Sequence, residues 1–181
     1  MTQHASTMMT AHSERMNTME KLITRMGFAM IIIGLLGLSN TAFAQQGTDQ
    51  EYNKLFDDVS NYIPIYEDDL GDNYWGLYYY VEEYMVLNST LNDNDWWSAF
   101  LHETVHVIQD CQNISEGLPL FDTNVFQSSI EASDPTGYSE VSWFALGYDE
   151  EYYDVEFEAE YIARFSSISY IQSLFDLHCK G

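Results

Sequence analysis

Apolar residues recur three or four positions apart in three parts of the chain, the spacing of one face of an α-helix. The first part predicts a short helix over residues 49–63, which ends before Pro64. The second predicts a helix over about residues 96–112, preceded by polar residues that can cap its first turn. The third predicts a helix from residue 150 or 151 towards residue 177, with a break around residues 166–169.

Two short runs rich in aromatic and aliphatic residues lie between the first two predicted helices. They cover residues 75–80 and 84–87 and predict a β-hairpin, with a single aromatic helix as the alternative. Aspartate, glycine and asparagine at 68–73 predict a turn, and residues 113–136 predict a loop with one short element near 125–130. Helices and a hairpin in one short chain predict a small α+β domain.

The composition indicates a folded, strongly acidic protein. The chain has 181 residues, enough for one domain, and 46% of them are hydrophobic and 15% aromatic. This apolar content favours a folded core over a disordered acidic segment. The chain carries 29 acidic and 6 basic side chains, a net charge of −23. The charge predicts no binding to nucleic acid or to an anionic membrane surface, because the phosphates would be repelled.

Residues 1–44 have the layout of a secretory signal peptide behind an N-terminal extension. Two basic residues precede an uncharged apolar stretch over residues 27–38, and small residues follow up to Ala44. The stretch is about half the ~20 residues that span a bilayer, which predicts cleavage after Ala44 and no stable membrane anchor afterwards. The mature domain, residues 45–181, is therefore predicted to be secreted or periplasmic.

Both cysteines, Cys111 and Cys179, lie in the predicted mature domain. Export to an oxidising compartment favours a disulfide between them, and two buried free thiols are the alternative. A bridge would close a loop of nearly 70 residues and tie the C-terminus to the middle of the fold.

The second predicted helix carries an H-E-x-x-H motif. Its two histidines, His102 and His106, are one turn apart on the same helix face, so both imidazoles can bind one metal ion. Glu103 is displaced around the helix and is suited to contact a metal-bound water rather than the metal. A solvated polar face is the alternative, although such faces usually carry lysine, arginine and glutamate.

A catalytic zinc site takes three protein ligands, so a further ligand is required. A third histidine at the metzincin spacing is absent. The last predicted helix offers several glutamates, and its Ala159 and Ala163 form a small surface that another helix can approach closely. Glu156 and Glu160 share that face, which favours Glu156 as the third ligand and Glu160 as the partner of a ligand histidine. A solvated helix N-terminus, where acidic residues are favoured by the helix dipole, is the alternative.

The order of a hairpin, an H-E-x-x-H helix and a distant glutamate resembles the gluzincin branch of zinc metallopeptidases. The segment Glu156-Phe157-Glu158-Ala159-Glu160 is similar to the E-x-x-A-D motif of the Ste24/HtpX-type peptidases, with glutamate in place of the final aspartate. The resemblance implies a zincin-like domain with three zinc ligands, namely His102, His106 and Glu156. It implies that Glu103 is the general base. It also implies an edge strand along which the substrate backbone aligns, formed by Tyr84, Met85, Val86 and Leu87.

These observations predict an exported zinc-dependent metallopeptidase, with Zn²⁺ as cofactor and a peptide or protein as substrate. A tyrosine is expected to stabilise the oxyanion, and four unranked candidates are Tyr138, Tyr148, Tyr152 and Tyr161. The first alternative is a secreted zinc hydrolase of another class, such as an amidase. The second is a secreted binding domain in which the metal is structural or the site is catalytically inactive.

Overall fold

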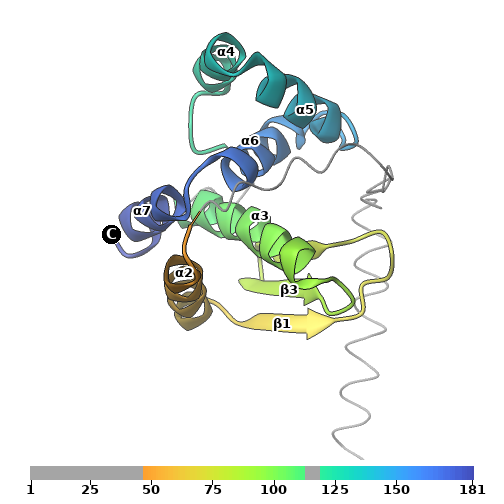
Figure 1. Cartoon of the computed structure of the whole chain (residues 1–181), viewed down its shortest axis with the longest axis vertical. Helices are drawn as coiled ribbons and strands as arrows, with labels where there is room; N and C mark the ends of the chain where they lie inside the picture. The colour runs from red at the N-terminus through yellow and green to blue at the C-terminus, as the bar shows by residue number, and fades with distance from the viewer. Residues whose placement is uncertain (1–46, 113–118) are drawn as a thin grey trace, which may run out of the picture. The chain divides into compact units, whose positions relative to one another are not determined.

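The computed structural model describes residues 47–112 and 119–181, which form six helices and a three-stranded sheet (Figure 1). The predicted α+β class is confirmed. The predicted extension and signal peptide lie outside the described residues. Among the described helices, none is both long and apolar enough to cross a membrane. In chain order the elements are α2 (Asp49–Tyr62), β1 (Ile65–Asp68), β2 (Gly76–Tyr79), β3 (Tyr84–Asn88), α3 (Asp93–Cys111), α4 (Thr123–Ser133), α5 (Pro135–Ala145), α6 (Tyr153–Phe165) and α7 (Ile168–Cys179).

The three predicted helices are present, and side-chain caps explain where they begin. Thr48 forms a capping box with Glu51 at the start of α2. Asn92 accepts hydrogen bonds from two backbone N–H groups in the first turn of α3, so this helix starts three residues before the predicted position. Ser167 caps α7 directly after α6 ends, which confirms the predicted break.

The segment predicted to be mostly loop is largely helical where it is described, and that prediction is wrong. Helix α4 occupies residues 123–133, and α5 follows after the single residue Asp134. Asp134 ends α4 and caps α5, where its side chain accepts from the Gly137 N–H and Pro135 takes the first helical position. Both helices are only 11 residues long and bury few side chains, so their apolar periodicity is weak.

The sheet has the strand order β1-β3-β2. The predicted hairpin is confirmed, because β2 and β3 pair antiparallel. Strand β1, which the sequence pattern did not predict, pairs parallel with the other side of β3 and ends at Asp68, at the start of the predicted turn. The predicted edge strand Tyr84–Leu87 is therefore wrong: β3 is the central strand, and its backbone is bonded on both sides. The edge strands are β1 and β2, and β2 is packed beside α3.

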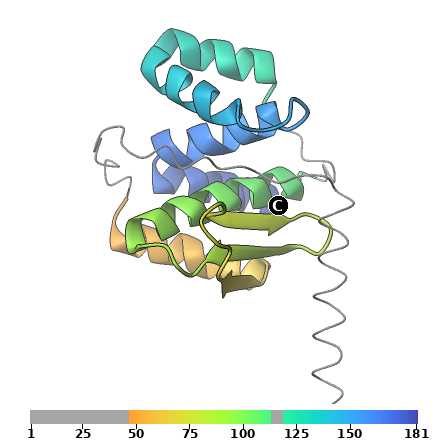
Figure 2. The same cartoon turned by 90° about the vertical axis from the view of Figure 1, so that its right-hand side faces the viewer.

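Helix α3 lies between the sheet and helices α6 and α7, and α4 and α5 cover α6 on its other side (Figures 1 and 2). This central position leaves most of α3 buried, including the polar side of the helix. The main core joins α2, the sheet, α3, α6 and α7, and a smaller cluster joins α4 and α5 to α6. The bulkiest fully buried side chains include Phe100, Phe157 and Phe175.

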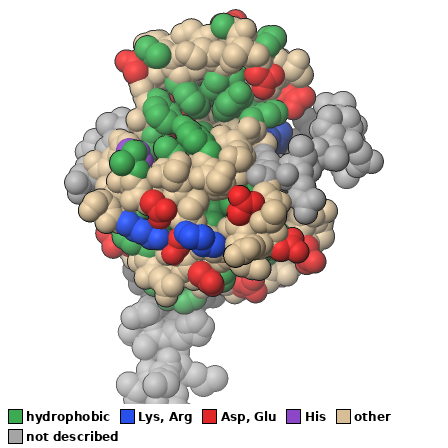
Figure 3. All heavy atoms as spheres, turned by 60° about the vertical axis from the view of Figure 1, so that its left-hand side comes forward, with side chains coloured by type: hydrophobic (Ala, Val, Ile, Leu, Met, Phe, Trp, Pro, Cys, Tyr) green, Lys and Arg blue, Asp and Glu red, His purple; other side chains and the backbone are tan. Residues whose placement is uncertain are grey.

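Each lysine and arginine in the described part of the chain belongs to an ion pair. Lys54 pairs with Asp58, and Lys180 pairs with Asp58 and Asp176. Figure 3 shows Lys and Arg side chains among acidic ones in the lower half of this face. Arg164 forms the remaining pair, with Glu160. The exposed pairs of Lys54 and Lys180 contribute little to stability. Since Arg164 is paired with the buried Glu160, no described lysine or arginine is free to form a basic patch.

The predicted disulfide is confirmed. It joins Cys111 at the end of α3 to Cys179 at the end of α7, with Cα atoms 5.0 Å apart. The bond therefore ties the last helix to the helix that carries the H-E-x-x-H motif.

Loss of this disulfide should lower the free energy of unfolding by about 4 kcal/mol, because the unfolded chain would no longer be closed into a long loop. The two cysteines are 68 positions apart. Urea unfolding of the wild type and of the Cys111→Ser/Cys179→Ser double variant, followed by circular dichroism, measures the difference. A decrease below about 1 kcal/mol would contradict the chain-entropy account of this bond.

Candidate metal centre

The two motif histidines converge on one point from successive turns of α3. Their ring centroids are 4.8 Å apart, and the two Nε2 atoms are separated by 3.1 Å. His106 is buried, with 4% of its surface exposed, and His102 is partly buried. The predicted alternative of a solvated polar face is therefore wrong, since Glu103 and Gln109 are buried on the same helix.

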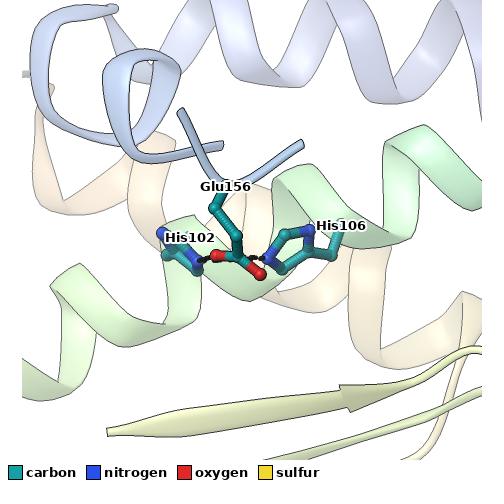
Figure 4. A group of neighbouring side chains, drawn as sticks. All are labelled: His102, His106 and Glu156. Carbon is teal, nitrogen blue, oxygen red and sulfur yellow. Dashed lines mark hydrogen bonds and ion pairs between the residues drawn. The ribbon is translucent and has the colours of Figure 1, made fainter. Parts of the chain in front are cut away.

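Glu156 reaches between the two imidazoles from α6 (Figure 4). Its Oε2 atom lies 3.2 Å from Nε2 of His102 and 3.5 Å from Nε2 of His106. Three ligands at about 2.0–2.1 Å around a tetrahedral zinc ion would be roughly 3.3 Å from one another. The separations between the three ligand atoms are 3.1, 3.2 and 3.5 Å, close to this distance, so the group could hold a metal ion.

The outer nitrogen of His102 is held as predicted. His102 Nδ1 lies 3.0 Å from Oε2 of Glu160, and Arg164 pairs with the other oxygen of this carboxylate. Arg164 also lies over the Phe144 ring, 5.7 Å from its centroid. The carboxylate therefore fixes the orientation of the imidazole while the guanidinium compensates its charge.

The outer nitrogen of His106 has partners that the sequence did not reveal. His106 Nδ1 lies 2.7 Å from Oε1 of Gln109 and 3.2 Å from the hydroxyl of Tyr80. Gln109 in turn donates to Glu158, which points away from the ligand side of α6. Glu158 is nevertheless buried, so the acidic run of α6 is not the solvated helix N-terminus of the alternative interpretation.

Glu103 stands next to the three ligands without being one of them. It is buried, its carboxylate accepts from the backbone N–H of Tyr78, and it interacts electrostatically with both histidines. Burial raises the pKa of this carboxyl. A Cβ atom on Gly76 would lie 2.7 Å from Cγ of Glu103, so β2 needs glycine here to leave room for the side chain. Nothing in the sequence pattern marked Gly76.

The buried charges shift one another's titration. Burial works against the charged form of His102, but the hydrogen bonds that its ring donates to Glu156 and Glu160 outweigh it and raise the pKa of this ring well above 6.5. The pKa of His106 is also raised against burial, mainly by Glu156. Burial opposes ionisation of Glu156, yet the two imidazoles lower its pKa to about 2. Two imidazoles and an ionised carboxylate are the donors that zinc prefers.

Tyr148, one of the four candidate tyrosines, lies at the site. Tyr148 interacts with Glu156, Glu160 and Glu103, and burial raises its pKa. The other three have different surroundings: Tyr138 packs against Phe157, Tyr161 lies 3.5 Å from Asp134, and Tyr152 interacts with acidic neighbours in the loop before α6.

Comparison of the chain with protein-family models, with curated proteins and with solved structures finds no match. The resemblance to gluzincins therefore remains a prediction.

The raised histidine pKa values predict how stability depends on pH in protein stripped of metal by a chelator. A raised pKa stabilises the folded state fully below the unfolded value of about 6.5, and this contribution is lost as pH rises through the folded value. The lowered pKa of Glu156 adds a second limb, in which stability falls as pH drops from about 4.5 towards 2.

Urea unfolding of the chelator-treated protein should therefore show a stability that declines as pH rises above about 6.5. Zinc-saturated protein should not show the decline above pH 6.5, because the metal takes the place of the histidine proton. Stability of the metal-free protein that rises between pH 6.5 and 8 would contradict the assignment.

Proposed function

We propose that this protein is an exported zinc-dependent peptidase. The observation that carries the proposal is the convergence of His102, His106 and Glu156 on one point beside a buried glutamate that is not a ligand. Two histidines and one glutamate are a ligand set of catalytic zinc sites, which keep a fourth position open. A structural zinc site is usually closed by four protein ligands and has no use for a neighbouring base. The Cys111–Cys179 disulfide supports export, because such bonds persist in oxidising compartments.

Zinc held by these three residues would supply Lewis acidity and a water with a pKa near ~7. Glu103 is the residue placed to take a proton from the attacking water and to deliver it to the leaving amine. Its raised pKa brings it closer to the working range of a proton carrier. The backbone N–H of Tyr78 donates a hydrogen bond to this carboxylate, and Gly76 leaves space for it because it has no side chain.

Tyr148 is the residue that we assign to the developing oxyanion. Its side chain is buried and forms a hydrogen bond with the ligand Glu156. The high pKa keeps the phenol protonated and therefore able to donate a hydrogen bond to negative charge on the carbonyl oxygen. Tyr80 is less suited, because its hydroxyl lies at the outer nitrogen of His106.

The substrate backbone is proposed to align along β2 rather than β3. Among the described strands, β2 pairs only with β3, so its other edge has backbone groups without a strand partner. The same strand contacts α3 and carries Gly76 against Glu103. An extended peptide added to this edge would be bound through its main chain, as in β-strand addition.

The variant Glu103→Gln should keep zinc and lose at least about 10²-fold in kcat, because the amide cannot carry the proton. Zinc content is measured by mass spectrometry, and turnover is measured on a library of quenched fluorescent peptides. Gly76→Ala should show the same pattern, since the added methyl group displaces Glu103. The matched control is Glu131→Gln, an exposed glutamate on α4, which should behave like the wild type.

Zinc-loaded wild type that cleaves no peptide but hydrolyses other amides would indicate the amidase alternative. Zinc-loaded protein without any hydrolysis, and with unaltered properties in Glu103→Gln, would indicate a binding domain.

Tyr148→Phe should lower kcat by roughly 10²-fold with little change in KM, because the lost hydrogen bond acts mainly in the transition state. Tyr138→Phe is the matched control, since this tyrosine packs against Phe157 away from the ligands. Unchanged kcat in Tyr148→Phe, with zinc content preserved, would remove this residue from the mechanism.

A further inference from the structure

A buried chain of hydrogen bonds runs from His106 on α3 to Glu158 on α6, through Gln109. His106 Nδ1 lies 2.7 Å from Oε1 of Gln109. The Gln109 Nε2 atom lies 2.9 Å from Oε2 of Glu158 and 3.2 Å from the carbonyl oxygen of Val155. Gln109 and Glu158 are 0% and 1% exposed, so water does not compete for these bonds.

The groups around Glu158 fix the direction of these bonds. Its carboxylate contacts the backbone N–H groups of Leu120 and Phe121 at 2.5 and 2.9 Å, in addition to the Gln109 amide. Both backbone groups are donors, so the oxygens of Glu158 act as acceptors. Gln109 must therefore turn its NH₂ group towards Glu158, and the Val155 carbonyl favours the same orientation. A flipped amide would bring its oxygen to about the 2.9 Å that now separates Nε2 from the carboxylate, which is a repulsive contact.

This orientation leaves the Gln109 oxygen facing His106. An amide oxygen can only accept, so Nδ1 of His106 has to carry a proton and donate it. The Tyr80 hydroxyl, 3.2 Å from the same nitrogen, can share this donor through its oxygen. A neutral His106 with its proton on Nδ1 keeps its lone pair on Nε2, the atom that faces His102 and Glu156.

We propose that Glu158 is a positioning residue that acts through Gln109 to hold His106 in the tautomer that can bind a metal ion. The inference rests on the metal site of the proposed function, but it does not depend on peptide hydrolysis. It also explains why α6 carries a glutamate at every second position. Glu156 is placed as the ligand, Glu160 orients His102 directly, and Glu158, on the other side of the helix, orients His106 through the amide.

The test is a double-mutant cycle on zinc affinity, measured by chelator competition on the purified protein. Glu158→Gln should weaken zinc binding by about 10- to 100-fold, because one amide cannot accept from all the donors that face it and Gln109 is free to flip. Gln109→Leu should weaken it to a similar extent. In the Gln109→Leu background, Glu158→Gln should have no further effect on zinc affinity.

The matched control is the bond between Gln127 and Asp154, which also joins an amide to a carboxylate of α6 but touches neither histidine. Gln127→Leu and Asp154→Asn should leave the zinc affinity unchanged. Unchanged zinc affinity in Gln109→Leu, or additive losses in the double variant, would overturn the proposal.

A second measurement does not need zinc and separates this inference from the proposed function. In ¹⁵N-labelled metal-free wild type, at a pH at which His106 is neutral, the His106 Nδ1–H and the Gln109 NH₂ protons should be protected from solvent exchange, and Glu158→Gln should abolish the protection of both. Absence of a protected Nδ1–H in the wild type would overturn the inference even if Glu158→Gln failed to fold. Protected protons in a protein that binds no zinc would instead support the hydrogen-bond chain from His106 to Glu158 and overturn the metal site.

Discussion

The structure depends on the contact between α3 and α6, in which ionisable side chains are buried against one another. Glu103, Glu156, Glu158 and Glu160 are all buried, and among the described residues Arg164 is the one arginine or lysine paired with them. An isolated carboxylate in a protein interior costs several kcal/mol, so these groups are tolerable only with hydrogen-bond donors and positive charge nearby. Backbone N–H groups satisfy Glu158 and the guanidinium satisfies Glu160. The imidazoles of His102 and His106 interact with Glu156 and Glu103, and a bound divalent ion would compensate the remaining negative charge.

The remaining elements fix the positions of α3 and α6. The sheet covers one side of α3, and its edge strand β2 brings Gly76 and the Tyr78 N–H to Glu103. Helices α4 and α5 cover α6, and the loop after α5 places Tyr148 beside the ligands. The disulfide fastens α7 to the end of α3. The contacts of β2 and of the loop after α5 end at groups that the proposed chemistry uses, and the disulfide restrains the helix that carries the two histidines.

The sequence predicts the parts of this arrangement that follow from local rules. Helical spacing identifies the histidine pair, and helix phase selects Glu156 as the third ligand and Glu160 as the partner of a histidine. Predicted export to an oxidising compartment predicts the disulfide. It does not predict β1 or α5, because a four-residue strand and a short helix carry little periodicity. It misplaces the edge of the sheet, because strand order is decided by tertiary pairing rather than by the strand itself. For the same reason the sequence does not reveal the roles of Gln109, Glu158 and Gly76, which depend on the contacts of α3 with α6 and β2.

His102, His106 and Glu156 are proposed to bind one catalytic metal ion together. The most direct test is the zinc content of the purified protein after reconstitution and removal of excess metal, for wild type, Glu156→Gln and the exposed control Glu131→Gln. About one zinc ion per chain is expected in the wild type and in the control, and a strongly reduced content is expected in Glu156→Gln. A wild type that retains no zinc, or a Glu156→Gln variant that retains as much as the wild type, would contradict this proposal.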